Sequence, residues 1–146
     1  MAKSADLAKF RENYYVASAA ASQNARTLAL AGLAFIWLFR PKEGGIESLP
    51  GLLYVAGCVF VLVLVLDVLH YAYASAAWGI FSRYTETRLQ KMPGSTYQEV
   101  KIEAPEQINW PTLTFFWGKQ LALFGGYVVV ALYTLLSRVY PHCIPR

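Results

Sequence analysis

The hydrophobic pattern of the chain is dominated by residues 49–73, an apolar stretch that a single charged residue, Asp67, interrupts. Residues 52–66 carry no charge. A helix of that length covers only about 22 Å, whereas the hydrocarbon core of a bilayer is about 30 Å thick. A helix that crosses a bilayer here must therefore run past Asp67 and bring its carboxyl group into the membrane.

The helix that contains this stretch is predicted to outlast the membrane. No proline follows until Pro93, so we expect one helix over residues 51–90 that projects beyond the bilayer. An alternative division ends the helix near Gly79 and lays residues 80–91 along the membrane surface as an amphipathic segment.

A first long helix is predicted over residues 5–39, which contain no proline and only one glycine, Gly32. Its apolar block, residues 27–39, would cover only about 20 Å, which is too short for a bilayer. The span must therefore begin near Ala20. It then draws four polar residues into or just under the membrane: Ser22, Gln23, Asn24 and Arg26.

A third helix is predicted over residues 111–138, because Asn109-Trp110-Pro111 combines a helix cap, an interface anchor and a first-turn proline. Residues 91–110 form the preceding irregular loop, in which residues 97–103 are either a short strand or an extended segment. The fold class is therefore an all-α integral membrane protein. It has one membrane domain (1–146) with three transmembrane helices, and its first two helices extend into the cytoplasm.

Composition and charge agree with this interpretation. A hydrophobic content of 56% and a mean hydropathy of +0.35 exceed the values of ordinary soluble domains. Seven basic residues lie on the side of the N-terminus: Lys3, Lys9, Arg11, Arg83, Arg88, Lys91 and Lys101. The opposite side has four: Arg40, Lys42, Arg138 and Arg146. The bias predicts that the N-terminus is cytoplasmic.

Each predicted span carries one formal charge, and the three charges fall at similar depth. Arg26 lies about 9 Å from the cytoplasmic edge of its span, Asp67 about 8 Å and Lys119 about 12 Å. Three further polar residues lie near this layer: Asn24, His70 and Gln120. Ionisable groups at such depth are costly against lipid, so we expect them to face other helices or water.

Two interpretations of this polar layer stay open. In one, Arg26 and Asp67 form a salt bridge that fixes helix packing, while Lys119 extends toward the headgroups. In the other, the layer lines a hydrated cavity or pore between subunits, because three helices alone enclose too little space for one.

Small residues in the second and third helices suit close helix contacts. They are Ala72, Ala76, Gly79, Gly118, Gly125 and Gly126. A chain with three spans has little interior of its own. We therefore expect some of these residues to contact another copy of the chain in a homo-oligomer within the lipid bilayer.

Catalysis and metal binding are not indicated. The chain has two histidines, no phosphate-binding glycine loop and no metal-binding motif. Asp67 and His70 share a helix face, but no further ligands come from the same layer. We expect no enzyme activity, no metal and no cofactor.

The chain resembles small multi-span membrane effectors of bacterial antiphage defence systems, in particular the channel-type effectors of Hailong-like systems. The resemblance lies in Tyr14-Tyr15, Arg26 with Ala31-Gly32, Asp67, residues 77–81 (AWGIF), Asn109-Trp110-Pro111 and residues 116–119 (FWGK). It implies a channel in the bacterial inner membrane that a nucleotide or oligonucleotide regulates. The cations available to such a regulator on the cytoplasmic side are Arg83, Arg88, Lys91 and Lys101.

The leading hypothesis is therefore an oligomeric pore or ion channel that acts in antiviral defence and is gated from its cytoplasmic side. The alternative is a non-conducting membrane anchor or regulatory subunit that recruits a soluble partner protein through its projecting helices.

Overall fold

The computed structural model describes residues 2–41, 45, 48–90 and 109–139. Within these ranges the chain forms three α-helices and no strand: α1 (Ala2–Leu38), α2 (Gly51–Gln90) and α3 (Trp110–Val139). The predicted all-α class with three helices is confirmed. The loop expected before the third helix, including residues 97–103, falls almost entirely outside the described residues.

Helix ends follow the local sequence. At the end of α1 the backbone N–H of Phe39 donates to Ile36 O (3.0 Å) and that of Arg40 to Trp37 O (3.2 Å), which tightens the last turn before Pro41. α2 continues without a break through Gly79 to Gln90. The alternative that ended this helix near Gly79 is therefore wrong, since no proline or cap interrupts the backbone hydrogen bonds there.

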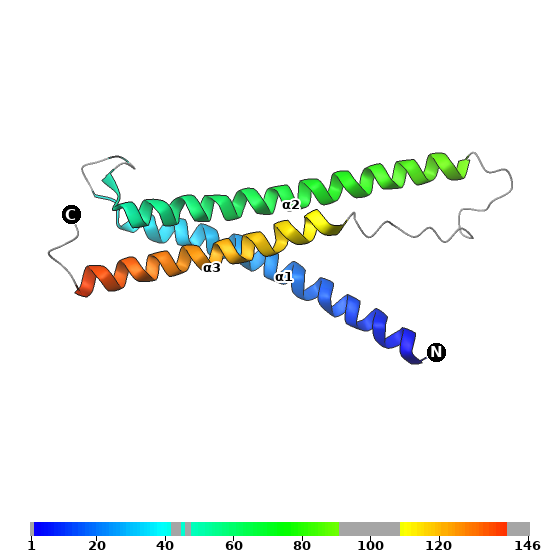
Figure 1. Ribbon diagram of the computed structural model, residues 1–146, viewed down its shortest axis with the longest axis horizontal. Helices are drawn as coiled ribbons and strands as arrows, with labels where there is room; N and C mark the ends of the chain where they lie inside the picture. Colours follow the sequence, from blue (N-terminus) through cyan, green and yellow to red (C-terminus); the bar gives the residue numbers. More distant parts are fainter. Residues whose placement is uncertain (1, 42–44, 46–47, 91–108, 140–146) are drawn as a thin grey trace.

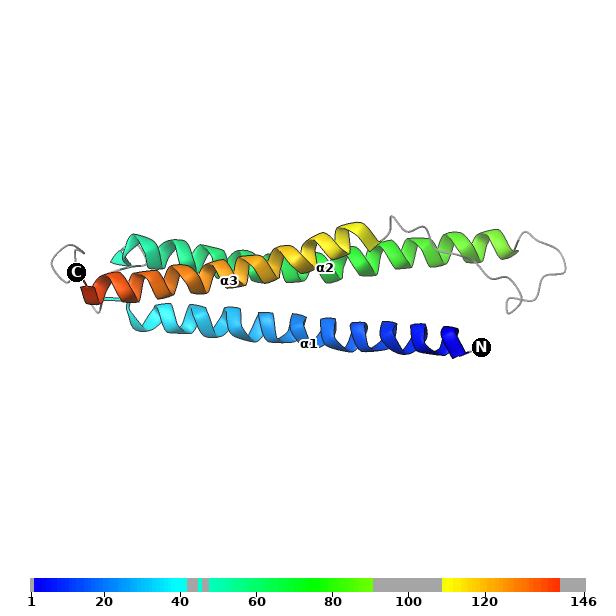
Figure 2. The same cartoon turned by 60° about the horizontal axis from the view of Figure 1, so that its bottom comes forward.

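The three helices form an elongated bundle. α1 and α2 are antiparallel, and α3 runs beside α2 with its C-terminal end near the turn that joins α1 to α2 (Figure 1). The N-terminal half of α1 leaves the bundle at an angle, so the N-terminus and the C-terminal end of α2 lie apart at the same end of the molecule (Figures 1 and 2).

Two of the helices, α2 and α3, are long and apolar enough to cross a membrane. α1 does not meet the same test, because Ser22, Gln23, Asn24 and Arg26 precede its apolar block. α2 has 40 residues, and a helix of that length reaches about 60 Å, twice the hydrocarbon thickness of a bilayer.

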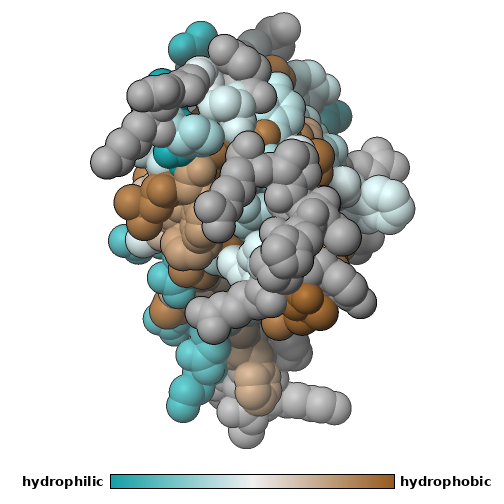
Figure 3. All heavy atoms as spheres, turned by 90° about the vertical axis from the view of Figure 1, so that its left-hand side faces the viewer, coloured by the Kyte–Doolittle hydropathy of each residue, from teal (hydrophilic) through white to brown (hydrophobic). Residues whose placement is uncertain are grey.

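The outer surface of the bundle is rich in large apolar side chains. Ile80, Leu121 and Phe124 are each at least 70% exposed. The end-on view in Figure 3 shows apolar patches on the outside of the bundle. Large exposed apolar surface is unfavourable in water and suits contact with lipid or with a partner, which favours a membrane location.

The centre of the bundle is a single aromatic ring held between two glycines. Phe60 of α2 is completely buried. A Cβ atom on Gly32 of α1 would lie 2.5 Å from Phe60 Cε2, and one on Gly126 of α3 would lie 2.7 Å from Cε1. On one side the ring also meets the edge of Tyr127, with ring centroids 5.1 Å apart. Only residues without a side chain leave room for this ring.

The predicted small-residue contacts divide into two groups. Gly118 and Gly126 face α2, the former with an added Cβ 3.7 Å from Leu66. The other four residues have no such neighbour: added Cβ atoms at Gly79 and Gly125 meet nothing within 4 Å, and the alanines of the set, Ala72 and Ala76, are exposed. Their contact with another copy of the chain stays a prediction.

The Phe60 contact yields a matched pair of substitutions. Gly126→Ala should destabilise the bundle by about 1–3 kcal/mol, because the new methyl group overlaps a ring that Gly32 confines from the other side. Gly125→Ala should be neutral or stabilise by up to about 1 kcal/mol through helix propensity. Thermal unfolding in detergent measures both, and equal stability of the two variants would contradict the packing described.

Candidate functional site

The polar residues of the bundle gather two helical turns from Phe60. Asp67 lies seven residues after Phe60 and Lys119 seven residues before Gly126, so both repeat the buried face of their helices. On α1 the equivalent position, seven residues before Gly32, is the buried Ala25. Arg26 follows it, turned by about 100° around the helix, and is therefore half-exposed rather than buried.

The carboxylate of Asp67 is shared by two cations from different helices. Lys119 Nζ lies 2.8 Å from Asp67 Oδ1, and Arg26 places Nη2 at 2.6 Å and Nε at 2.8 Å from Oδ2. The exposed fractions of the side chains are 0% for Lys119, 5% for Asp67 and 50% for Arg26. One anion thus holds all three helices together.

The ammonium group of Lys119 is fully satisfied inside the bundle. It donates to Asp67 Oδ1, to Ser22 Oγ (2.9 Å) and to His70 Nδ1 (3.2 Å), which uses all three of its N–H groups. The rings of Tyr71 and Phe116 lie 5.5 and 5.6 Å from Nζ. Lys119 is therefore a packed member of the cluster, and the expectation that it extends toward the headgroups is wrong.

The buried side chains of the cluster satisfy one another's hydrogen bonds. Among the described residues, no buried side-chain nitrogen or oxygen lacks a hydrogen-bond partner. Charged groups are tolerated in a protein interior only when they pair and form hydrogen bonds with one another. Of the two interpretations of the polar layer, the geometry inside a single chain matches the packing salt bridge.

Of the other residues predicted in the polar layer, two make contacts between helices and one is exposed. His70 joins the cluster and stacks on Tyr71, with ring centroids 5.1 Å apart and an interplanar angle of 13°. Gln120 donates from Nε2 to Ala21 O (3.2 Å) and so ties α3 to α1. Asn24 is exposed on the outside of α1.

One member was missed by sequence reasoning. Ser22 is buried and accepts the hydrogen bond from Lys119. Its position four residues before Arg26 places it on the same side of α1 as that arginine, and this spacing was the signal that could have identified it.

Two of the basic residues predicted to face the cytoplasm, Arg83 and Arg88, lie away from the cluster. Arg83 and Arg88 are exposed on the C-terminal part of α2. Lys91 and Lys101 fall outside the described residues. Arg83 and Arg88 are therefore accessible on the surface of the C-terminal part of α2.

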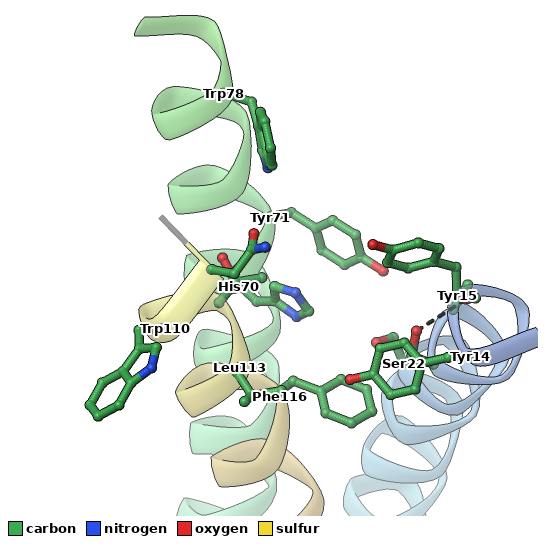
Figure 4. A pocket seen from close by; sticks show the side chains of 13 residues that line it. Tyr14, Tyr15, Ser22, His70, Tyr71, Trp78, Trp110, Leu113 and Phe116 are labelled. Carbon is green, nitrogen blue, oxygen red and sulfur yellow. Dashed lines mark hydrogen bonds between the residues drawn. The ribbon is translucent and has the colours of Figure 1, made fainter. Parts of the chain in front are cut away.

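A cavity of about 440 Å³ lies beside the cluster, where α1 diverges from α2 and α3. Ser22 and His70 belong to both the cluster and the cavity wall. Figure 4 shows Tyr71 of α2 and Tyr15 of α1 pointing toward one another across it. The remaining wall comes from Tyr14, Ser18, Ala19, Trp78, Asn109, Trp110, Thr112, Leu113 and Phe116. Of these aromatic residues, Trp110 was predicted to be an anchor at the membrane interface.

The described residues contain no group of three or more His, Cys, Asp or Glu side chains that could hold a metal ion. The arrangement offers instead a fixed salt bridge between helices and an uncharged, aromatic cavity with hydrogen-bonding groups at its floor.

The cluster predicts an order of stabilities. Asp67→Asn should cost about 3–5 kcal/mol, because it leaves the buried Lys119 without a counter-ion. Lys119→Met should cost less, because Asp67 keeps Arg26, and the half-exposed Arg26→Gln should cost least. Denaturant unfolding in detergent measures these changes.

The double variant Asp67→Asn with Lys119→Met provides the control. It removes both buried charges, so it should be more stable than Asp67→Asn alone. Strictly additive losses in the double variant would show that the two side chains do not interact.

No known protein family, curated protein or solved structure matches this chain. Its function is therefore inferred from the chemistry of its own residues.

Proposed function

We propose that this protein is an oligomeric pore- or ion-channel-forming protein of the bacterial inner membrane, with α1 as a third span and a gate on the cytoplasmic side. The observation that carries the proposal is the exposed polar strip of α1 at the level of the buried cluster. Its members are Gln23 and the half-exposed guanidinium of Arg26, which lie three residues apart on one side of the helix.

The depth of this strip determines what it can face. With Phe60 at the centre of the bilayer, the cluster lies about 10 Å from the centre, inside a half-thickness of about 15 Å. Polar and charged side chains at this depth are costly against lipid. A second copy of the chain or a water-filled path accounts for the strip, whereas the neighbouring surfaces of α2 and α3 carry apolar residues such as Val68 and Leu121.

The conduction path must lie between copies of the chain. Phe60 fills the space between the three helices, and Lys119 and Asp67 are closed off from water. The path therefore passes Arg26 rather than the carboxylate of Asp67, which acts as the support that holds Arg26 in place. This refines the role of the polar layer in the channel hypothesis.

The cytoplasmic gate is assigned to the projecting ends of α1 and α2. The excess of basic residues on that side favours a cytoplasmic N-terminus, and Arg83 and Arg88 offer exposed cations to an anionic regulator. A nucleotide or oligonucleotide regulator and a role in antiviral defence rest on the sequence resemblance alone.

Ion flux tests the proposal. The purified particle should have a protein mass that is a multiple of 16.3 kDa, and it should conduct ions in liposomes. Arg26→Gln should raise the permeability to cations relative to anions about two- to tenfold, because it removes a positive charge from the path. Arg88→Gln, a similar loss of charge outside the membrane, should leave the ratio unchanged. A monomeric particle without flux would contradict the proposal.

The alternative is a non-conducting anchor that recruits a soluble partner protein. It is favoured by the salt bridge of Asp67 with Lys119, whose side chains are 5% and 0% exposed, and by the length of α2, which exceeds a bilayer's thickness. Absence of flux together with one stoichiometric copurifying protein would support this function instead.

A further inference from the structure

We propose that the cavity between α1, α2 and α3 binds a neutral, planar aromatic molecule that carries a carbonyl acceptor. This chemistry is shared by quinones dissolved in the membrane and by soluble aromatic carbonyl compounds. The proposal goes beyond the channel function and does not depend on it.

The walls of the cavity suit a flat ring. Tyr14 and Tyr15 come from α1, Tyr71 and Trp78 from α2, and Phe116 from α3, so aromatic side chains approach from three helices (Figure 4). A volume of about 440 Å³ falls within the range of roughly 300–1,000 Å³ that is typical of small-molecule sites. Offset stacking and edge contacts between aromatic rings stabilise a ligand of this shape.

The absence of charged residues from the cavity wall favours a neutral ligand. None of the thirteen lining residues carries a formal charge, since His70 accepts a hydrogen bond from Lys119 at Nδ1 and is therefore neutral. The nearest cations, Arg26 and Lys119, are both paired with Asp67 behind the wall. An ionised headgroup such as a phosphate would find no free counter-charge within the cavity wall and would lose its hydration.

His70 supplies a fixed hydrogen-bond donor at the floor of the cavity. Its Nδ1 lies 3.2 Å from the ammonium of Lys119, which can only donate, so Nδ1 accepts and the ring proton is on Nε2. Stacking on Tyr71 and an edge contact with Phe116 hold the ring in place. Within the described part of the chain Nε2 has no hydrogen-bond partner, and it is the donor available to a ligand carbonyl.

The position of the cavity allows two sources of ligand. It lies at the end of the bundle where α1 diverges and α3 begins, beside the level of the salt bridges. With Phe60 at the bilayer centre, the site falls at the edge of the hydrocarbon region. A quinone could reach it from the bilayer and a soluble aromatic compound from the aqueous side.

Tryptophan fluorescence provides the test, because Trp78 and Trp110 line the cavity while Trp37 and Trp117 do not. The probes are menadione, a soluble naphthoquinone, and a long-tailed ubiquinone added to nanodiscs that hold the full chain. Both should quench the fluorescence in a saturable manner. Trp78→Phe should remove at least half of the saturable quenching, whereas Trp37→Phe should leave it in place.

His70→Asn tests the donor separately from the fold. The asparagine amide oxygen can accept the hydrogen bond from Lys119, so the cluster is kept, but the donor directed into the cavity is lost. Binding of menadione should weaken about tenfold at unchanged thermal stability. His70→Gln, which places an amide N–H near the position of Nε2, should retain more affinity than His70→Asn.

Each outcome of these binding experiments either supports or overturns the proposed site. Tighter binding of the tailed probe identifies the bilayer as the source, and equal binding identifies the aqueous side; both support the site. Non-saturable quenching, equal quenching in the two tryptophan variants, or displacement of menadione by phosphatidylglycerol but not by phosphatidylcholine would overturn the proposal. The measurement needs no ion gradient, so its failure is distinct from failure of the channel function.

Discussion

The carboxylate of Asp67 is the group on which the bundle depends, because within the described helices it binds cations from both α1 and α3. Lys119 binds one of its oxygens and Arg26 the other. Electrostatic interactions are strong where water is excluded, and an unpaired charge there is correspondingly costly. The cluster therefore contributes to the relative register of the three helices, because sliding one helix would separate the paired charges.

Phe60 defines the second fixed level of the bundle. Its ring occupies the space that Gly32 and Gly126 leave open, two helical turns from the salt bridges. The two levels are stabilised by different interactions: the Phe60 level by close packing and the Asp67 level by salt bridges. Together they hold α1 against α2 and α3 in its C-terminal half, while the N-terminal half diverges and opens the aromatic cavity.

The cluster and the cavity share Ser22 and His70. Lys119 directs the tautomer of His70, and His70 in turn lines the cavity. An occupant of the cavity would therefore contact a residue that is hydrogen-bonded to the central salt bridge. This continuity is a physical route by which a ligand could influence helix packing and, through Arg26, the exposed polar strip of α1.

The sequence by itself determined the three helices, the apolar character of α2 and α3, and the common level of Arg26, Asp67 and Lys119 along the bundle, because helix rise converts residue number into position along a helix axis. The tertiary structure alone decided that Lys119 is buried rather than extended to the headgroups, that Ser22 completes its hydrogen bonds, and that Asn24 stays outside. It also brought aromatic residues from all three helices around one cavity. These features depend on the rotation of each helix about its axis and on where α1 diverges, and such quantities arise only when side chains from different helices compete for the same space.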